Sequence, residues 1–374
     1  MTDLDSYLAS FEAEPGYLDW AAFGPLSAAV RAETQADAEL LGNGRRSSID
    51  LVASRAHGAR EILAELLAAR VDEIVLQPST TYGLMQAVYG LTGTLIVSRA
   101  EFPSLTVCAT RAAQVRDQLS VAWIDPPEGF VTPEAVRDAL TDQTTAVAVS
   151  LVDFRTGYTT DLTALREVIG DRLLIVDAVQ GFGVVDADFA AADVVCGNGY
   201  KWLRAGRGTG WARYSDRAVA RITPVLSGFV GTAGEGLPLG VVPAPASGAR
   251  AFAVTGDDVL ASGRLVTALD EVRGAGVPAI ADAVAERADE MIYYADRYDV
   301  PVLTPHERAH RAGIVALAPA PAEVGPLAAA LTNRGVTFTT RAGHIRLAAH
   351  AATGADTLQL LGDALAEFAT ARSW

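Results

Sequence analysis

A regular alternation of short β-rich runs with helical patterns begins near residue 73 and restricts the fold more than any other feature of the sequence. Such alternation is typical of βαβ units, in which parallel strands form a sheet and the connecting helices cover it. The strand patterns are 73–77, 94–98, 121–124, 145–151, 173–177, 193–196 and 210–214, and the helical patterns between them are 80–89, 105–119, 133–140 and 162–169. We therefore expect an α/β fold with a mostly parallel sheet covered by helices.

The pattern changes after a Gly- and Pro-rich stretch at 227–248. Long helical patterns follow at 257–273 and 277–298, then strand patterns at 314–318, 336–340 and 344–347, and a last helical pattern at 355–371. This order of elements predicts a second, smaller α+β domain at the C-terminus. We divide the chain into an N-terminal arm (1–27), a large α/β domain (28–245) and the small domain (246–374).

The charge of the chain restricts its partners. The formal net charge is -15, which would repel nucleic-acid phosphates and anionic lipid. The N-terminus is acidic and lacks an apolar signal core, the histidines show no metal-ligand spacing, and Cys108 and Cys196 lie far apart. We therefore expect a small-molecule substrate, a cytoplasmic location, no nucleic-acid or membrane partner, no disulfide framework and no metal site.

Lys201 is the only lysine in the chain, because 29 of the 30 Lys and Arg residues are arginine. An amine can be deprotonated by its surroundings and can then attack a carbonyl to form a Schiff base, whereas a guanidinium stays protonated. Chance retention of one lysine codon in GC-rich coding is the alternative. We interpret Lys201 as a functional amine.

A strand pattern ends in Asp177, at the kind of position where ligands of open α/β sheets bind. Gln180 follows three residues later. A buried carboxylate there could pair with a pyridinium nitrogen and keep it protonated, so that the ring accepts electrons when a bond to a substrate Cα breaks. An Asp that ends a strand can also simply cap the next turn. The residues alone leave both roles open for Asp177.

Two further loops point to a ligand. The Ser-Thr-Thr run at 79–81 opens a helical pattern, where hydroxyls and free backbone NH groups favour a phosphate, although such residues are also ordinary N-caps. Lys201 lies between Tyr200 and Trp202 after a strand pattern, and the glycine-rich run 206–210 follows. Glycines let the backbone approach a ligand closely.

Asp177, followed 24 positions later by Lys201 and then by a glycine-rich turn, resembles the class V aminotransferase family, which belongs to the fold type I enzymes of pyridoxal 5'-phosphate (PLP). The resemblance is to the cysteine desulfurase and kynureninase-like branch. Segments 17–19, 24–26, 79–81 and 101–104 are similar to motifs of the family, and 150–157 and 205–206 are similar to segments of its kynureninases. The resemblance covers most of the chain. It implies a mostly parallel sheet of the seven-stranded type in the large domain, a smaller C-terminal domain and PLP as cofactor.

The resemblance also implies roles for individual residues. Lys201 would form the Schiff base with PLP and shuttle a proton at Cα, and Asp177 would contact the pyridine nitrogen. It further implies Gln180 near the ring 3-oxygen, Phe102 stacked on the ring, Thr80, Thr81 and Tyr200 at the phosphate, Ser150 near the ring edge, Arg346 at the substrate carboxylate and Thr255 at the partner subunit's phosphate. A plain surface position is the alternative for Arg346. Fold type I active sites lie between two subunits, so the resemblance implies a homodimer.

Departures from the family narrow the reaction. Cysteine desulfurases carry a nucleophilic cysteine shortly before the carboxylate-binding arginine, and no cysteine follows Cys196 here, so we reject persulfide chemistry. Kynureninases carry a histidine where this chain has Gln180, and their Trp and His are missing around 228–232, so we expect a substrate other than kynurenine. Transamination, racemisation and β-elimination remain, and all three begin from an external aldimine.

We therefore predict a PLP-dependent enzyme that acts on an α-amino acid through an external aldimine, with amine transfer as the first choice. A lyase that cleaves a C–S or C–C bond, or an epimerase, is the alternative. A nicotinamide oxidoreductase would share the βαβ pattern, but the run 206–210 lacks the dinucleotide-binding spacing. A non-catalytic binding protein of the same fold would lack turnover, and the presence of both Asp177 and Lys201 argues against it.

Overall fold

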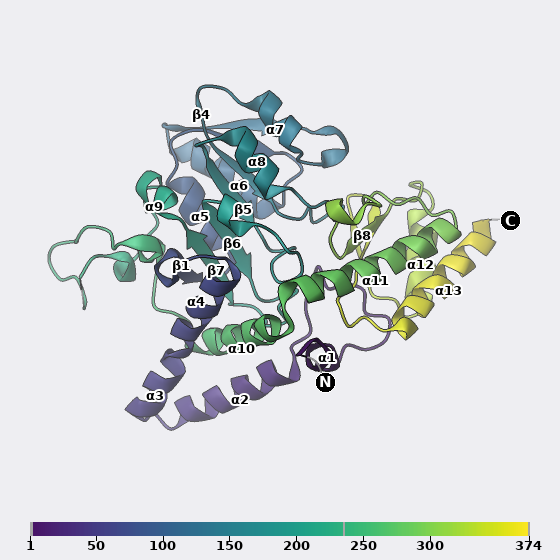
Figure 1. Ribbon diagram of the computed structural model, residues 1–374, viewed down its shortest axis with the longest axis horizontal. Coiled ribbons are helices and arrows are strands. Elements are labelled where there is room, and N and C mark those ends of the chain that lie inside the picture. The colour runs from purple at the N-terminus through teal and green to yellow at the C-terminus, as the bar shows by residue number, and fades with distance from the viewer. Residues whose placement is uncertain (1–2, 235, 373–374) are drawn as a thin grey trace.

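The protein is represented by a computed structural model that describes residues 3–234 and 236–372. Its centre is a seven-stranded sheet with the strand order β1-β7-β6-β5-β4-β2-β3 (Figure 1). The strands are β1 (Ile74–Gln77), β2 (Gly93–Ser98), β3 (Leu119–Ile124), β4 (Thr144–Ser150), β5 (Leu173–Asp177), β6 (Val194–Asn198) and β7 (Gly210–Tyr214). Strand β7 is antiparallel to both of its neighbours, and the other neighbouring pairs are parallel. The predicted mostly parallel sheet is confirmed.

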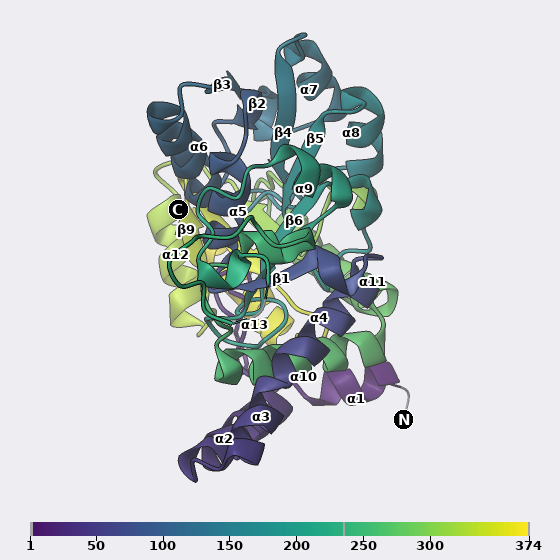
Figure 2. The same ribbon diagram turned by 90° about the vertical axis from the view of Figure 1, so that its left-hand side faces the viewer.

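Helices cover both faces of this sheet, because its strands carry apolar side chains on both faces. In β5, Leu174 and Val176 belong to one cluster of buried side chains, whereas Leu173 and Ile175 belong to the cluster on the other face. Figure 2 shows α5 and α6 on one side of the strands and α7 and α8 on the other. The helices of this region are α4 (Arg55–Leu66), α5 (Thr80–Tyr89), α6 (Pro103–Val115), α7 (Pro133–Ala139), α8 (Leu162–Ile169), α9 (Asp216–Arg221) and α10 (Val259–Ala275).

A second sheet, with the order β8-β10-β9, is antiparallel and packs with three helices around a core of its own. Its elements are α11 (Val277–Arg297), β8 (Ile314–Leu317), α12 (Val324–Asn333), β9 (Thr339–Arg341), β10 (His344–Ala348) and α13 (Ala355–Arg372). The first helices of the chain are α1 (Asp3–Ala9), α2 (Ala28–Gly42) and α3 (Arg46–Ala53). The predicted domain boundaries stay a prediction. No helix in residues 3–234 and 236–372 has both the length and the apolar character needed to cross a bilayer.

The bounds of several expected elements were wrong by one or more residues, and three of them are instructive. The helix expected at 105–119 is α6 and ends at Val115, because Arg116 adopts an extended conformation before β3 begins. The helix expected from residue 257 begins only at Val259, because the side chain of Asp258 accepts a hydrogen bond from the Ala261 backbone NH as an N-cap. The strand expected at 336–340 is observed as the later and shorter β9.

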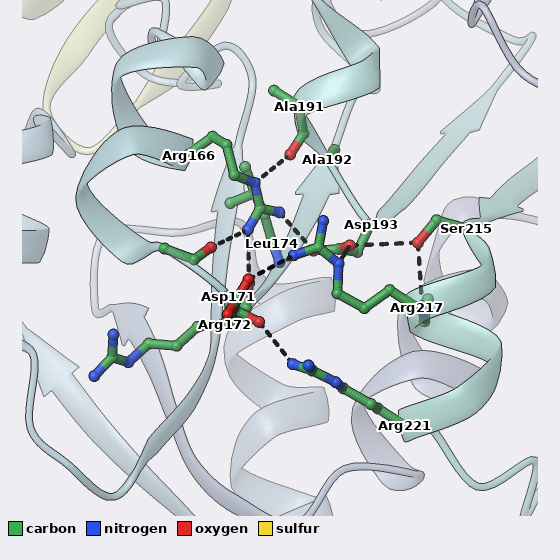
Figure 3. A network of polar contacts seen from close by, with 12 residues as sticks. Arg166, Asp171, Arg172, Leu174, Ala191, Ala192, Asp193, Ser215, Arg217 and Arg221 are labelled. Carbon is green, nitrogen blue, oxygen red and sulfur yellow. Dashed lines mark hydrogen bonds and ion pairs between the residues drawn. The ribbon is translucent and has the colours of Figure 1, made fainter.

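A buried carboxylate lies where the central strands β5 and β6 begin, at the opposite end of these strands from Asp177 and Asn198 (Figure 3). Asp193 immediately precedes β6 and is 1% exposed. One of its oxygens lies 2.5 Å from Arg166 Nη2 and accepts from the Leu174 backbone NH at 2.9 Å. The other lies 2.9 Å from Arg217 Nε and accepts from the Ser215 hydroxyl at 3.3 Å. Asp193 thus links β5 and β6 to α8 and to the start of α9.

We expect Asp193→Asn to lower the free energy of unfolding by roughly 2–3 kcal/mol, because an amide cannot balance two guanidinium groups and one of them is largely buried. Urea denaturation followed by circular dichroism measures this change. Asp171→Asn is the matched control, since Asp171 is 99% exposed and lies 3.8 Å from Arg217, so its loss should cost less than about 0.5 kcal/mol. Equal effects of the two substitutions would contradict a structural role specific to Asp193.

Candidate active site

A cavity of about 320 Å³ lies at the carboxyl ends of β4, β5 and β6. Its lining residues are Ser79, Thr80, Thr81, Phe102, Ser104, Ser150, Val152, Phe154, Asp177, Val179, Gln180, Asn198, Tyr200, Lys201 and Arg207. The structure therefore brings eight of the ten predicted site residues into one cavity. Their individual roles stay predictions.

Lys201 lies in the loop after β6 and is only 8% exposed. Its Nζ atom lies 5.8 Å from the centroid of the Phe102 ring and 5.6 Å from that of Tyr200. Burial lowers the pKa of the amine from 10.5 to about 8; the Asp177 carboxylate opposes this effect, and the charge of Arg346 adds to it. A lysine with this pKa has a substantial neutral, nucleophilic fraction near neutral pH.

The lysine loop packs tightly against the N-terminal segment and the small domain. The Gly24 backbone NH donates to the Tyr200 carbonyl at 2.9 Å, and a Cβ at Gly24 would lie 1.9 Å from the Lys201 carbonyl oxygen. His350, which follows β10, contacts the Trp202 carbonyl through Nε2 at 2.9 Å. Only glycine fits at position 24, so the N-terminal segment helps to position the lysine.

Asp177 ends β5 and is 6% exposed. Its Oδ1 accepts a hydrogen bond from the Val179 backbone NH at 3.0 Å. Burial raises the pKa of the carboxyl to about 6, against the opposing effects of that hydrogen bond and of the Lys201 charge. Asp177 is therefore mostly ionised at neutral pH and can pair with a cationic group in the cavity.

One end of the cavity is suited to an anion. It contains the start of α5, whose first backbone NH groups have no partner within the helix, and the hydroxyl groups of Thr80 and Thr81. Asn198 Nδ2 donates to Thr80 Oγ1 at 2.9 Å, and Thr81 Oγ1 lies 2.8 Å from Ser104 Oγ. The guanidinium carbon of Arg207 lies 4.6 Å from the centroid of the Tyr200 ring and adds a positive charge to the lining.

Phe102 and Gln180 lie in the wall of the cavity. The ring of Phe102 meets that of Phe154 edge to face, with 5.0 Å between the centroids. Gln180 donates through Nε2 to the Ala21 carbonyl at 3.0 Å and accepts at Oε1 from Trp202 Nε1 at 2.9 Å. The amide of Gln180 therefore also connects the N-terminal segment to the lysine loop.

Two predicted site residues do not line this cavity. Thr255 lines a separate pocket of about 180 Å³, together with residues that include Gly208 and Asp258. Arg346 is 2% exposed and donates through Nη1 to the backbone carbonyl of Phe154, a residue of the cavity wall, at 3.0 Å. Its Nη2 lies 3.4 Å from Asp19 Oδ1, and its buried Nε has no hydrogen-bond partner among the described residues. Arg346 thus adjoins the cavity with unused hydrogen-bonding capacity.

Sequence reasoning assigned no role to Ser104, Asn198, Arg207 or Glu101. Ser104 and Glu101 belong to the segment that resembles the family's stacking motif, and Arg207 lies in the glycine-rich turn after Lys201. The sequence therefore placed these residues near predicted site residues. Only the fold shows that the side chains of Ser104 and Arg207 reach the cavity and that Glu101 contacts Ser150, which lines it. Glu101 is buried, and its Oε2 accepts a hydrogen bond from the Ser150 hydroxyl at 2.5 Å.

The residues fit a planar phosphorylated cofactor that carries an aldehyde. The anion end supplies hydroxyl groups, helix NH groups and a guanidinium, and Phe102 offers an aromatic face. Asp177 and Lys201 supply a buried carboxylate and an amine of lowered pKa in the same cavity. The donor set therefore matches the predicted cofactor, PLP.

Comparison with known proteins agrees with this description. The model of the family described as "Aminotransferase class-V" matches residues 16–345. The kynureninase of Deinococcus radiodurans is 30% identical over 263 residues, which are 67% of this chain and 62% of that protein. A kynureninase of Pseudomonas fluorescens is 30% identical over 232 residues, 58% of this chain and 55% of that protein. The chain thus spans less than two thirds of the length of these relatives.

Solved structures match over nearly the whole chain. The apo cysteine desulfurase of Thermococcus onnurineus has a TM-score of 0.84 with 17% identity and covers 96% of this chain and 95% of its own. The cystine C–S lyase C-DES, in complex with its product cysteine persulfide, also has a TM-score of 0.84, with 18% identity and 96% and 98% coverage. These matches confirm the predicted fold type I architecture.

We expect the apparent pKa of Lys201 to be about 8, because burial disfavours the charged amine. The pH dependence of labelling by a small acylating reagent, applied to protein freed of cofactor and read by peptide mass spectrometry, measures this value at the only lysine. Asp177→Asn should lower the pKa further, since the carboxylate stabilises the ammonium, whereas Asp186→Asn, at an exposed position, should not. A pKa near 10.5 in the native protein would show that the amine is not desolvated.

Proposed function

The chain belongs to the class V aminotransferase family of PLP-dependent enzymes, and from that premise we propose that it transfers the amine of an α-amino acid, with PLP bound covalently at Lys201. The observation that carries this proposal is the common cavity of Lys201 and Asp177, in which one amine and one carboxylate have strongly shifted pKa values. The prediction of a PLP-dependent enzyme of this family is confirmed by the family match.

PLP, when bound, supplies an electron-accepting ring that stabilises the charge left when a bond to the substrate Cα breaks. In our proposal Asp177, ionised above about pH 6, keeps the ring nitrogen protonated. Lys201, with a pKa of about 8, is suited to accept a proton from the substrate Cα and to return one. Near neutral pH these values leave Asp177 mostly ionised and give Lys201 a larger neutral fraction than an exposed lysine has.

We propose that the other residues of the cavity lining bind and orient the cofactor. We assign Thr80, Thr81 and Tyr200 to the cofactor phosphate, and Arg207 joins them as the cation of that end. In addition, Phe102 would stack on the ring, Ser150 would lie near the ring edge and Gln180 near the ring 3-oxygen.

Arg346 is the proposed binding site for the substrate carboxylate. Its guanidinium is 2% exposed, and its Nε has no partner among the described residues, so a carboxylate would satisfy a buried donor. Asp19, 3.4 Å away, partly balances its charge in the free protein. The bound carboxylate would draw the substrate toward the wall formed by Phe154.

A lyase is the second candidate, because both kynureninases named above are about 30% identical to this chain. Persulfide chemistry has no support in the described residues: Cys108 and Cys196 are both buried, and burial raises the pKa of the Cys108 thiol to about 12.

Incubation with a panel of amino acids separates amine transfer from lyase activity. Amine transfer depends on an added keto acid. Without one, a lyase that eliminates across a C–S bond releases pyruvate and ammonia, and a lyase that cleaves a C–C bond releases a shorter amino acid that keeps the amine. A cytoplasmic location stays a prediction.

The covalent role of Lys201 predicts a yellow protein whose visible band disappears on reduction with borohydride. Peptide mass mapping should then find a pyridoxyl adduct on Lys201, and Lys201→Ala should give neither the band nor the adduct. Because the chain has one lysine, an adduct elsewhere would have to be at the N-terminal amine. Saturating PLP that gives no band and no adduct would disprove the proposal.

We also propose a homodimer. The loop between η4 (Phe229–Gly231) and η5 (Gly248–Phe252) projects from the large sheet (Figure 1). Four of its aliphatic side chains are 71–86% exposed, namely Leu237, Leu239, Val241 and Val242. Exposed apolar side chains in such number are typical of an interaction surface. Thr255 lines a pocket apart from its own chain's active site, as a residue that reaches a partner's phosphate would.

Light scattering during size-exclusion chromatography should therefore give twice the chain mass of 39.1 kDa. Replacing Leu237, Leu239, Val241 and Val242 together by serine should increase the monomer fraction, because the apolar contact area is lost. Replacing exposed Val107 and Val115 of α6 by serine is the control and should leave the mass unchanged. A wild-type protein with the mass of one chain would refute the dimer.

A further inference from the structure

Glu101 lies between β2 and α6, directly after a turn at 99–100, and its carboxylate contacts Ser150 through both oxygens. Oε1 accepts from the Ser150 backbone NH at 3.0 Å, and Oε2 accepts from the Ser150 hydroxyl at 2.5 Å. Glu101 is 9% exposed, whereas Ser150 lines the cavity at the end of β4. Ser150 is also the register partner of Asp177 on the neighbouring strand.

The carboxylate of Glu101 has no cationic partner among the ion pairs of the described residues. Burial raises its pKa to about 7 against the two hydrogen bonds from Ser150, and the charges of Asp177 and Asp153 raise it further. Asp153 itself is paired with Arg155 at 2.7 Å. A buried carboxylate without a cation is costly, because an amide or an apolar side chain of similar size would avoid the desolvation. This cost favours a functional reason for a carboxylate at position 101.

We propose that Glu101 is a positioning residue that turns the Ser150 hydroxyl hydrogen away from the cavity, so that Ser150 presents only lone pairs to the bound cofactor. The proposal rests on the function proposed above. An ionised carboxylate can only accept, so Ser150 must donate to it and remains an acceptor toward the ring edge. A protonated Glu101 would instead donate to Ser150 Oγ, and the Ser150 hydrogen would then point into the cavity.

The direction of this hydrogen bond depends on pH. Above about pH 7 Glu101 is ionised and Ser150 is an acceptor toward the cavity; below that pH Ser150 becomes a donor. The charged groups that bear on Glu101 are Asp177 at the end of β5 and Asp153, with its partner Arg155, after β4. Burial raises the pKa of Asp177 as well, and the charge of Asp177 raises that of Glu101.

Glu101→Gln tests this directly, because glutamine keeps the shape and both contacts but reverses one of them. Its Oε1 can still accept from the Ser150 NH, while its Nε2 can only donate, which forces the Ser150 hydroxyl to turn into the cavity. Ser150→Ala removes the hydroxyl, and the double variant shows whether Glu101 acts through Ser150. Glu134→Gln, at an exposed position on α7, is the matched control.

The first measurement uses protein without cofactor. The amide signal of Ser150 in NMR spectra should titrate with a midpoint near pH 7 in the wild type and in Glu134→Gln, but not in Glu101→Gln. A Ser150 amide that does not titrate in the wild type, or that titrates equally in Glu101→Gln, would overturn the proposal. This result does not depend on PLP binding and so separates failure of the inference from failure of the proposed function.

The second measurement follows the visible absorption band of the PLP-loaded protein against pH. The band of Glu101→Gln at pH 8 should resemble that of the wild type at pH 6, and Glu101→Gln should change nothing in the Ser150→Ala background. An equal spectral change in both backgrounds would mean that Glu101 acts by its charge alone, and the proposal would be wrong.

If Glu101→Gln fails to fold, Ser150→Ala tests the same point. The spectral transition near pH 7 that we expect in the wild type should then be absent in Ser150→Ala, and a transition that persists there would overturn the proposal.

Discussion

The opposed desolvation of two buried charges, Asp177 and Lys201, is the constraint on which the rest of the site depends. Burial moves the carboxyl pKa up to about 6 and the amine pKa down to about 8, while each charge partly restores the other. If Lys201 were exposed, its pKa would return to its ordinary value and the amine would be almost wholly protonated at neutral pH; if Asp177 were exposed, the pKa of its carboxyl would fall back toward its ordinary value. The reactivity of Lys201 therefore depends on the surrounding residues that bury its amine, and not on the lysine alone.

The segments that bury Lys201 lie far apart in the sequence, and they pack together around the loop that follows Lys201. Arg204 is 1% exposed; its guanidinium carbon lies 3.9 Å from the ring centroid of Phe11, and its Nη2 lies 3.3 Å from Glu271 on α10. Burial lowers the pKa of His350 to about 3, so the ring is neutral, with Nε2 donating to the Trp202 carbonyl and Nδ1 accepting from the next backbone NH. The N-terminal segment, the large sheet and the small domain thus all contribute to the position of one amine.

Much of this could be predicted from the sequence, because strand periodicity and strand-end residues are local signals. The seven strands, Asp177 at a strand end and the lone Lys201 were all readable in that way. Glu101 and Arg207 were not assigned, because their importance comes from contacts across strands or loops that no local pattern encodes. Arg346 was identified by resemblance, yet it lies beside the cavity and not in its lining, since that distinction depends on how the small domain packs.

The use of arginine for every basic position except Lys201 has a physical consequence for an enzyme with an aldehyde cofactor. A free aldehyde condenses with any accessible neutral amine, but not with a guanidinium, which stays protonated even when buried. Arginine therefore serves the buried ion pairs, such as Arg213 with Glu73 at 2.7 Å and Arg166 with Asp193 at 2.5 Å, without offering a competing site. With a single lysine, the only side-chain amine available for covalent attachment is the one whose pKa the fold has lowered.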